Sequence, residues 1–171
     1  MQKSRKPWFI ITLRMGVSYV MEKVRVLFLC GRNTARSQMG EAFLRHMGGD
    51  MFDVWSAGLE PGDGVLQIVK DVMSEVGIDM SMHYSKSAME LLDKGLEFDI
   101  VVTVCDAAVA GRCPDYPGVS RKLHWPFPDP AALKGSHEEV LNGARKIRDM
   151  IRDAVGELIK EVVEEGGFSG R

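Results

Sequence analysis

The sequence is short of several features that would place it in a common class of protein. It has three cysteines in 171 residues, an odd number that does not suggest the disulfide framework of a small secreted protein. Its net charge of −2 gives no electrostatic argument for binding nucleic acid or an anionic membrane surface. A run of about 20 apolar residues, which a membrane span needs, is missing. We therefore expect a cytoplasmic protein whose thiols are free to react.

The length is that of one domain large enough to bury a core. The first twenty residues differ from the rest of the chain, with a short apolar run between basic residues. That run is too short for the apolar core of a signal peptide. Met21 begins a stretch that reads like the first strand of a domain. We expect residues 1–20 to be an upstream extension or a mis-assigned start, residues 21–163 to form the domain, and residues 164–171 to be a flexible tail.

Apolar patterns of two kinds alternate along the chain. Short β-rich runs predict strands, and apolar residues three or four positions apart predict helices. This alternation is typical of an α/β fold with three layers, in which helices flank a four-stranded parallel sheet. The strands are expected at Val24–Leu29, Phe52–Trp55, Phe98–Val104 and Arg121–Trp125, and the helices at Ser37–Met47, Val65–Val76, Ser85–Leu92 and Glu138–Val163.

Reactive and polar residues come after each predicted strand. Cys30, Ser56, Cys105 and Asp129 lie in or next to the four loops at the carboxyl ends of the strands. In open parallel sheets the binding site lies beyond those ends. The sequence therefore predicts that these four positions share one edge of the sheet.

The loop after the first predicted strand has the chemistry of an oxyanion site. Cys30 and Arg36 stand at its two ends, and the helix expected from Ser37 begins immediately behind it. Backbone N–H groups at a helix start favour a bound anion and a thiolate, and a guanidinium can hold two anion oxygens. A buried structural cysteine with a surface arginine nearby is the alternative. A nucleotide-binding P-loop is excluded, because the Gly-Lys-Ser/Thr ending is absent.

Two further cysteines and one carboxyl group could complete a reaction site. Cys105 and Cys113 could pass a disulfide along by thiol exchange, although they could also be ordinary thiols. Their spacing is not that of a zinc site, so we expect no metal. Asp129, on a proline-rich loop, is a candidate general acid or else a turn residue before Pro130. His83 looks like a surface or capping residue and carries no clear signal.

Three segments of the chain resemble the low-molecular-weight tyrosine phosphatase superfamily, and more closely its thioredoxin-coupled arsenate reductase branch. The first segment includes Leu-Cys-Gly-Arg-Asn-Thr-Ala-Arg-Ser and, farther on, Trp-Ser-Ala-Gly-Leu-Glu-Pro, within residues 26–61. The others are Val-Val-Thr-Val-Cys-Asp at 101–106 and His-Trp-Pro-Phe-Pro-Asp-Pro at 124–130. The likeness extends over residues 22–162, with the motifs in the same order as in the family.

The resemblance implies a mechanism. Cys30 would attack arsenate while Asp129 protonates the leaving oxygen. Cys105 would then attack Cys30 and release arsenite, and Cys113 would attack Cys105 to give a disulfide that thioredoxin or a similar dithiol protein reduces. No tightly bound cofactor is needed, and the protein would act as a monomer. The oxyanion-binding residues implied in this way are Gly31, Arg32, Asn33, Thr34, Ala35, Arg36 and Ser37.

The chain departs from the family at three places. Cys105 and Cys113 are one residue farther apart than in the best-known reductases. Lys86 stands where potassium-dependent members carry an Asp, although Asn33, Glu41 and Ser56 match the other positions of that cation site. A lysine ammonium would there take the place of the ion. Ala131 replaces the aromatic residue that phosphatases usually carry after Asp-Pro.

The sequence thus predicts a thioredoxin-dependent arsenate reductase. A phosphatase with the same nucleophile and acid is the first alternative, and in that enzyme Cys105 and Cys113 would be dispensable. A redox or oxyanion-binding module without turnover is the second.

Overall fold

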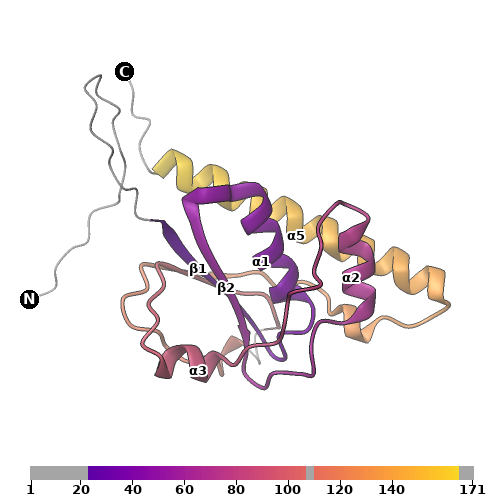
Figure 1. Ribbon diagram of the computed structural model, residues 1–171, viewed down its shortest axis with the longest axis horizontal. Coiled ribbons are helices and arrows are strands. Elements are labelled where there is room, and N and C mark those ends of the chain that lie inside the picture. The colour runs from indigo at the N-terminus through magenta and orange to yellow at the C-terminus, as the bar shows by residue number, and fades with distance from the viewer. Residues whose placement is uncertain (1–22, 107–109, 166–171) are drawn as a thin grey trace, which may run out of the picture.

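The computed structural model describes residues 23–106 and 110–165, which form a layered α/β domain around a parallel sheet (Figure 1). The strands lie in the order β2-β1-β3-β4, and every neighbouring pair is parallel, so the predicted four-stranded parallel sheet is confirmed. The predicted extension at residues 1–20 and the residues after 165 lie outside the described part. The strands are β1 (Val24–Cys30), β2 (Phe52–Gly58), β3 (Ile100–Thr103) and β4 (Arg121–His124).

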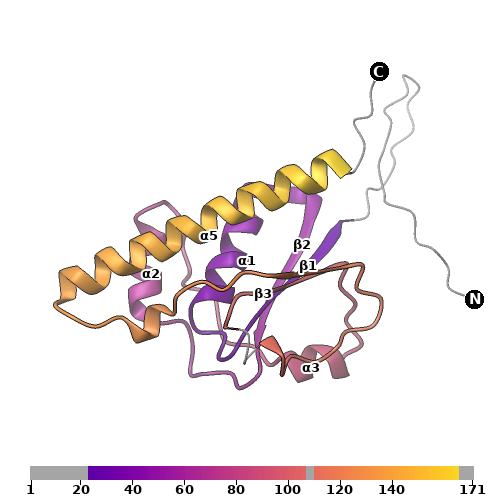
Figure 2. The ribbon, with the colours of Figure 1, turned by 180° about the vertical axis from the view of Figure 1, so that it is seen from behind.

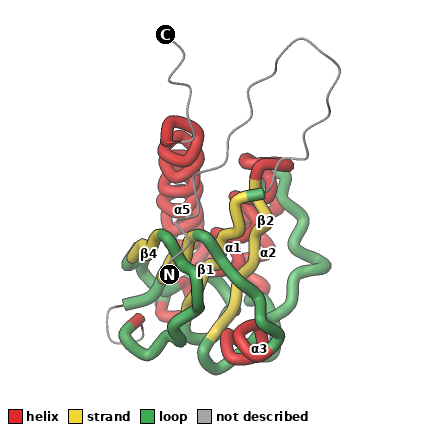
Figure 3. The backbone as a smooth tube through the Cα atoms, turned by 90° about the vertical axis from the view of Figure 1, so that its left-hand side faces the viewer, coloured by secondary structure: helices red, strands yellow, loops and turns green. Residues whose placement is uncertain are grey.

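The helices cover both faces of the sheet, as Figures 1 and 2 show from opposite sides. Helices α1, α2 and α5 share one face, and the short helix α3 lies on the other; Figure 3 shows the layers from the side. Among the described helices none combines the length and apolar character needed to cross a membrane. The helices are α1 (Arg36–Gly48), α2 (Gln67–Ser74), α3 (Ala88–Asp93) and α5 (His137–Glu165), with 3-10 turns at Gly49–Met51 and Pro130–Ala132.

Strand β1 is the centre of the core because both of its faces are covered. Val26 and Phe28 pack under α1, α2 and α5, whereas Leu27 and Leu29 pack toward α3. All four side chains are fully buried. A strand buried on both faces has a continuous apolar sequence, which is why this strand could be predicted. The same strand ends at Cys30, so the core fixes the position of the thiol.

Several predicted boundaries were wrong near the sheet edge. Ser56 lies inside β2 rather than in the loop after it, and it is completely buried. Helix α2 begins two residues later than predicted, because the backbone of Leu66 is extended, with a ψ of 139°, and its N–H donates to the Thr34 carbonyl. At the other end of the chain, α5 continues to Glu165, beyond the predicted start of the tail.

Candidate active site

The loop between β1 and α1 is held from outside through its carbonyl groups. A segment that comes after β2 runs alongside the loop and donates to four of these carbonyls. Ser85 and Gln38 satisfy the fifth, and α1 itself donates to the sixth. The pairs are Leu59 N to Cys30 O, Glu60 N to Gly31 O, Gly62 N to Arg32 O, Leu66 N to Thr34 O, Ser85 Oγ and Gln38 Nε2 to Asn33 O, and Met39 N to Ala35 O.

Because the carbonyls of this loop point outward, its N–H groups are left for the inner side. Asn33 makes the tight turn with a φ of +54°, a left-handed conformation that asparagine tolerates better than most residues. Ala35 caps α1 without any side-chain hydrogen bond, so the first N–H groups of the helix have no side-chain cap. An uncapped helix start behind a loop of inward N–H groups binds anions. Residues 31–35 form this loop and Arg36 and Ser37 begin α1, so the residues predicted to bind an oxyanion follow one another at this place.

The sulfur of Cys30 receives two hydrogen-bond donors from this loop. The N–H of Asn33 lies 3.0 Å from Sγ, and the hydroxyl oxygen of Ser37 lies 2.9 Å from it. The Asn33 side-chain amide donates to the same hydroxyl oxygen at 2.8 Å, which leaves the hydroxyl hydrogen of Ser37 to point at the sulfur. Donors aimed at a buried sulfur stabilise its negative form. Cys30 is thus set up as a nucleophile.

Arg36 and Asp129 meet at the mouth of the loop. The guanidinium donates to the Phe127 carbonyl at 3.0 Å and to Asp129 Oδ2 at 2.9 Å. The other carboxylate oxygen of Asp129 accepts the N–H of Ala131, the turn contact predicted as its alternative role. The side chain of Asp129 is 41% exposed, so the carboxyl group can exchange protons with solvent. The predicted general acid and the predicted anion ligand are therefore adjacent.

Cys105 and Cys113 come after β3 in the chain; Cys105 belongs to the core cluster that contains Cys30, and Cys113 packs against the other cluster. A hydrogen bond from the Cys113 side chain, aided by the charge of Arg36, lowers the pKa of Cys105. The pKa of Cys113 is raised, first because its thiol donates to Cys105 and also through burial and the charges of Cys105 and Cys30. All three cysteines are free thiols, and Cys113 is the most exposed. Of this hydrogen-bonded pair, Cys105 is therefore the more acidic thiol.

The four residues of the predicted cation or loop-support site also come together. The amide of Asn33 donates to Ser56 Oγ at 2.9 Å, and the hydroxyl of Ser56 donates to Glu41. The ammonium of Lys86 lies 3.3 Å from the same carboxylate of Glu41. Within the described residues no group of His, Cys, Asp and Glu could hold a metal ion.

The residues that support Asn33 from behind were not predicted from the sequence. The fully buried Gln38 donates to the Asn33 backbone and side-chain oxygens at 3.1 and 2.9 Å, and to Tyr84 O. His83, predicted as a surface or capping residue, is partly buried and bonds Gln38 Oε1, and burial lowers its pKa. A polar Gln in the third position of a helix often reaches back to the preceding loop, and this signal could have found Gln38.

A pocket of about 740 Å³ opens beside the loop. Arg32, Thr34 and Lys70 line it together with Tyr84 and Ala131. The positive charges of Arg32 and Lys70 favour an anionic ligand. Ala131 lines the pocket without an aromatic ring. Tyr84, which is 64% exposed, is the aromatic side chain of this pocket.

Comparison with known proteins agrees with this geometry. Residues 25–167 match the family described as low molecular weight phosphotyrosine protein phosphatase. The chain belongs to this family. Among curated relatives, an arsenate reductase of Halalkalibacterium halodurans is 41% identical over 147 residues, which are 85% of this chain and 99% of the relative. An arsenate reductase of Bacillus subtilis is 37% identical over 148 residues, with the same two shares.

Solved structures of family members have the same fold. An arsenate reductase in the phosphate binding state is 29% identical, with a TM-score of 0.70, over 81% of this chain and 98% of that one. A thioredoxin-dependent arsenate reductase of Corynebacterium glutamicum is 28% identical with a TM-score of 0.62, over 83% of this chain. The present chain spans 63% of the length of that protein. A tyrosine phosphatase of Erwinia amylovora, 19% identical with a TM-score of 0.64, shares the fold.

Proposed function

We propose that this family member is an arsenate reductase that works through Cys30, Cys105 and Cys113 and is regenerated by thioredoxin or a similar dithiol protein. The observation that carries the proposal is the packing of Cys105 in the same buried cluster as Cys30, with Cys113 hydrogen-bonded to Cys105. A phosphatase needs only the first thiol, whereas a reductase needs two more within reach. The names of the relatives, arsenate reductases over 85% of the chain, support the same activity.

The first step joins the substrate to the enzyme. The Cys30 thiolate attacks arsenic while the loop N–H groups and Arg36 bind the remaining oxygens, and a sulfur–arsenic bond forms as an arsenic–oxygen bond breaks. Asp129 gives its proton to the departing oxygen, which leaves as water. Arsenic is still pentavalent at this point, and no electrons have moved.

The second step is the reduction. The Cys105 thiolate attacks the sulfur of Cys30, so that a disulfide forms while the sulfur–arsenic bond breaks. The electron pair of that bond stays on arsenic, which is thereby reduced by two electrons and leaves as arsenite. Cys113 then loses its proton and attacks Cys105, which frees Cys30 and leaves a Cys105–Cys113 disulfide. A dithiol protein reduces this disulfide and becomes oxidised in turn. Cys113, the most exposed of the three, is the thiol that such a partner can reach.

The test is arsenite production by the full chain with thioredoxin, thioredoxin reductase and NADPH. Wild-type protein should turn over many times, and Cys30→Ser should produce no arsenite. Cys105→Ser should stop before arsenite release, whereas Cys113→Ser should release one equivalent and then stop. Multiple turnover by Cys105→Ser and Cys113→Ser would refute the relay.

The second candidate is a phosphatase, because Cys30, Arg36 and Asp129 together can hydrolyse a phosphate monoester. Hydrolysis of an aryl phosphate by the same variants separates the two activities. A phosphatase retains full hydrolysis in Cys105→Ser and Cys113→Ser and makes no arsenite. A protein that releases at most one arsenite per chain despite excess reductant would instead be a sensor. Every group in the proposed mechanism belongs to one chain, so we also propose that the protein acts as a monomer. We propose the cytoplasm as its compartment.

A further inference from the structure

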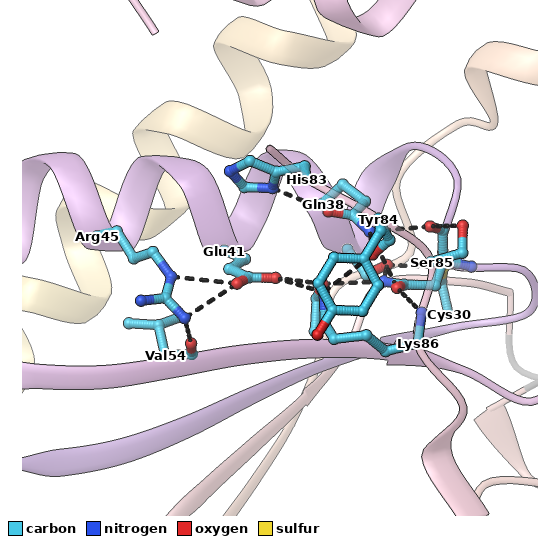
Figure 4. Close-up of polar contacts among 12 residues, drawn as sticks. Cys30, Gln38, Glu41, Arg45, Val54, His83, Tyr84, Ser85 and Lys86 are labelled. Carbon is cyan, nitrogen blue, oxygen red and sulfur yellow. Dashed lines mark hydrogen bonds and ion pairs between the residues drawn. The ribbon is translucent and has the colours of Figure 1, made fainter. Parts of the chain in front are cut away.

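Glu41 is a buried carboxylate held between two cations (Figure 4). One oxygen accepts from the half-exposed Arg45 at 3.1 Å. The other lies 3.3 Å from the ammonium of Lys86, whose side chain is only 10% exposed. Lys86 also donates to the Tyr84 carbonyl at 3.1 Å, and its ammonium lies 4.8 Å from the centre of the Tyr84 ring. A lysine is seldom this buried unless it is paired.

The position does not fit a bound monovalent cation. The oxygens around it, from the carboxylate of Glu41, the hydroxyl of Ser56 and the carbonyl of Tyr84, are those that a hard cation prefers. The ammonium of Lys86, however, already makes the contacts with Glu41 and Tyr84. An added ion would have to displace it or stand beside a like charge. The charge that such an ion would bring is therefore built into the chain.

A continuous line of hydrogen bonds joins this charge to the nucleophile. The carboxylate of Glu41 accepts from Ser56, the hydroxyl of Ser56 accepts from the Asn33 amide, and that amide also donates to Ser37 beside Cys30. The backbone N–H of Lys86 donates to the side-chain oxygen of the same Asn33 at 2.8 Å. Lys86 thus supports Asn33 twice, once through its backbone and once through its charge.

We propose that Lys86 is a positioning residue that supplies an internal cation to the network behind Cys30, so that this protein works without a bound monovalent cation. The inference rests on the proposed role of Cys30 as nucleophile. When the ammonium is removed, Glu41 keeps Arg45 on one oxygen, and on the other it loses its cation and keeps only the neutral hydroxyl of Ser56. A buried carboxylate in that condition takes up a proton or turns away, and the hydroxyl of Ser56 loses its fixed acceptor. Asn33 then no longer holds Ser37 in place against the sulfur.

The test compares Lys86→Met with Lys94→Met, which removes an exposed lysine directly after the last residue of α3. The methionine keeps the backbone N–H that binds Asn33 and deletes only the charge. The readout is alkylation of Cys30 by iodoacetamide at neutral pH, in chains that carry Ser at positions 105 and 113 so that no other thiol reacts. We expect the rate to fall roughly tenfold in Lys86→Met, the loss of one hydrogen bond to a charged group. Lys94→Met should match the parent.

A second readout reports on the charge itself. The field of Lys86 lowers the pKa of His83, whereas that of Glu41 raises it. Nuclear magnetic resonance titration should therefore find the pKa of His83 shifted in Lys86→Met, upward where Glu41 stays charged and downward where Glu41 takes up a proton or turns away. A folded Lys86→Met with unchanged alkylation and an unchanged pKa of His83 overturns the proposal.

A third measurement needs no variant that could fail to fold. The parent is alkylated in potassium, sodium and choline chloride at equal ionic strength, and we expect equal rates. A rate that rises with potassium alone overturns the internal cation.

Lys86→Ala, which opens space among the oxygens, should gain a response to potassium that Lys86→Met lacks. None of these measurements uses arsenate. If the protein fails to reduce arsenate, the alkylation results still hold. If the alkylation results contradict the role of Lys86, the reductase activity is still judged by arsenite production.

Discussion

Gly58 lies where β2 comes closest to the oxyanion loop, and replacing it by alanine tests whether the loop is held by close packing. An added Cβ would lie 2.7 Å from the carbonyl carbon of Arg32, 2.8 Å from the nitrogen of Asn33 and 3.0 Å from the oxygen of Gly31. All three neighbours are backbone atoms, so no flexible side chain can move aside. The φ angle of Gly58 is not in the left-handed region, so any effect comes from the contact and not from backbone strain.

The size of the effect can be worked out from overpacking. Forcing one methyl group into a closely packed site costs about 1–3 kcal/mol, and we expect the free energy of unfolding of Gly58→Ala to fall by that amount. The loop must also shift by several tenths of an ångström, which moves the N–H of Asn33 from its place against Cys30. A loss of about 1.4 kcal/mol in anion contacts corresponds to a tenfold weaker affinity for phosphate.

Urea denaturation measures the stability, and isothermal titration with phosphate measures the affinity. Gly156→Ala is the matched control, because its Cβ would meet only Met47 Cε, at 3.6 Å, on the surface of α5. Alanine is a better helix former than glycine, so this control should be neutral or more stable by up to about 1 kcal/mol. If Gly58→Ala behaves like Gly156→Ala in both measurements, the close approach of β2 does not shape the loop.

Three other changes have distinct expected results. Asp129→Asn should lower turnover with arsenate by roughly 10²–10⁴-fold, because proton donation is lost, while phosphate still binds to Arg36 and the loop N–H groups. Steady-state kinetics with a loss below tenfold would contradict that role. Cys113→Ala should raise the pKa of Cys105, because Cys105 loses its hydrogen-bond donor. The pH midpoint for forming the Cys30–Cys105 disulfide in a single turnover should therefore rise. A midpoint that stays or falls would contradict this prediction. Arg148→Met removes donors to Val72 O at 2.8 Å and to Glu75. Urea denaturation should show a free energy of unfolding lower by about 1–3 kcal/mol, with the single-turnover rate unchanged. A slower rate would mean that these contacts between α2 and α5 also affect the site.

The edge of the sheet was predictable because the signals for it are local. Strands β1 and β3 are marked by short, mostly apolar runs, and parallel strands bring the loops at their carboxyl ends to one place. Cys30, Cys105 and Asp129 could therefore be grouped from the sequence. Lys86 could be singled out only because the resemblance marked its position.

The support of the loop was not predictable in the same way. Its contacts join residues far apart in the chain, such as Ser85 Oγ with Asn33 O, and depend on backbone groups that every residue carries. Helix α3 begins at Ala88, later than predicted, because the backbone of Lys86 is used by Asn33 and Gly58 instead. The burial of His83 is set by its contact with Gln38, which no local pattern encodes.

The outward hydrogen bonds of the loop carbonyls separate the shape of the site from its chemistry. During one catalytic cycle the Cys30 sulfur would be bonded in turn to hydrogen, arsenic and another sulfur. The segment from Leu59 to Leu66 donates hydrogen bonds to the carbonyls on the other side of the loop and takes no part in these changes at the sulfur. The enzyme can therefore change the covalent state of its nucleophile repeatedly without rebuilding the frame that receives the next oxyanion.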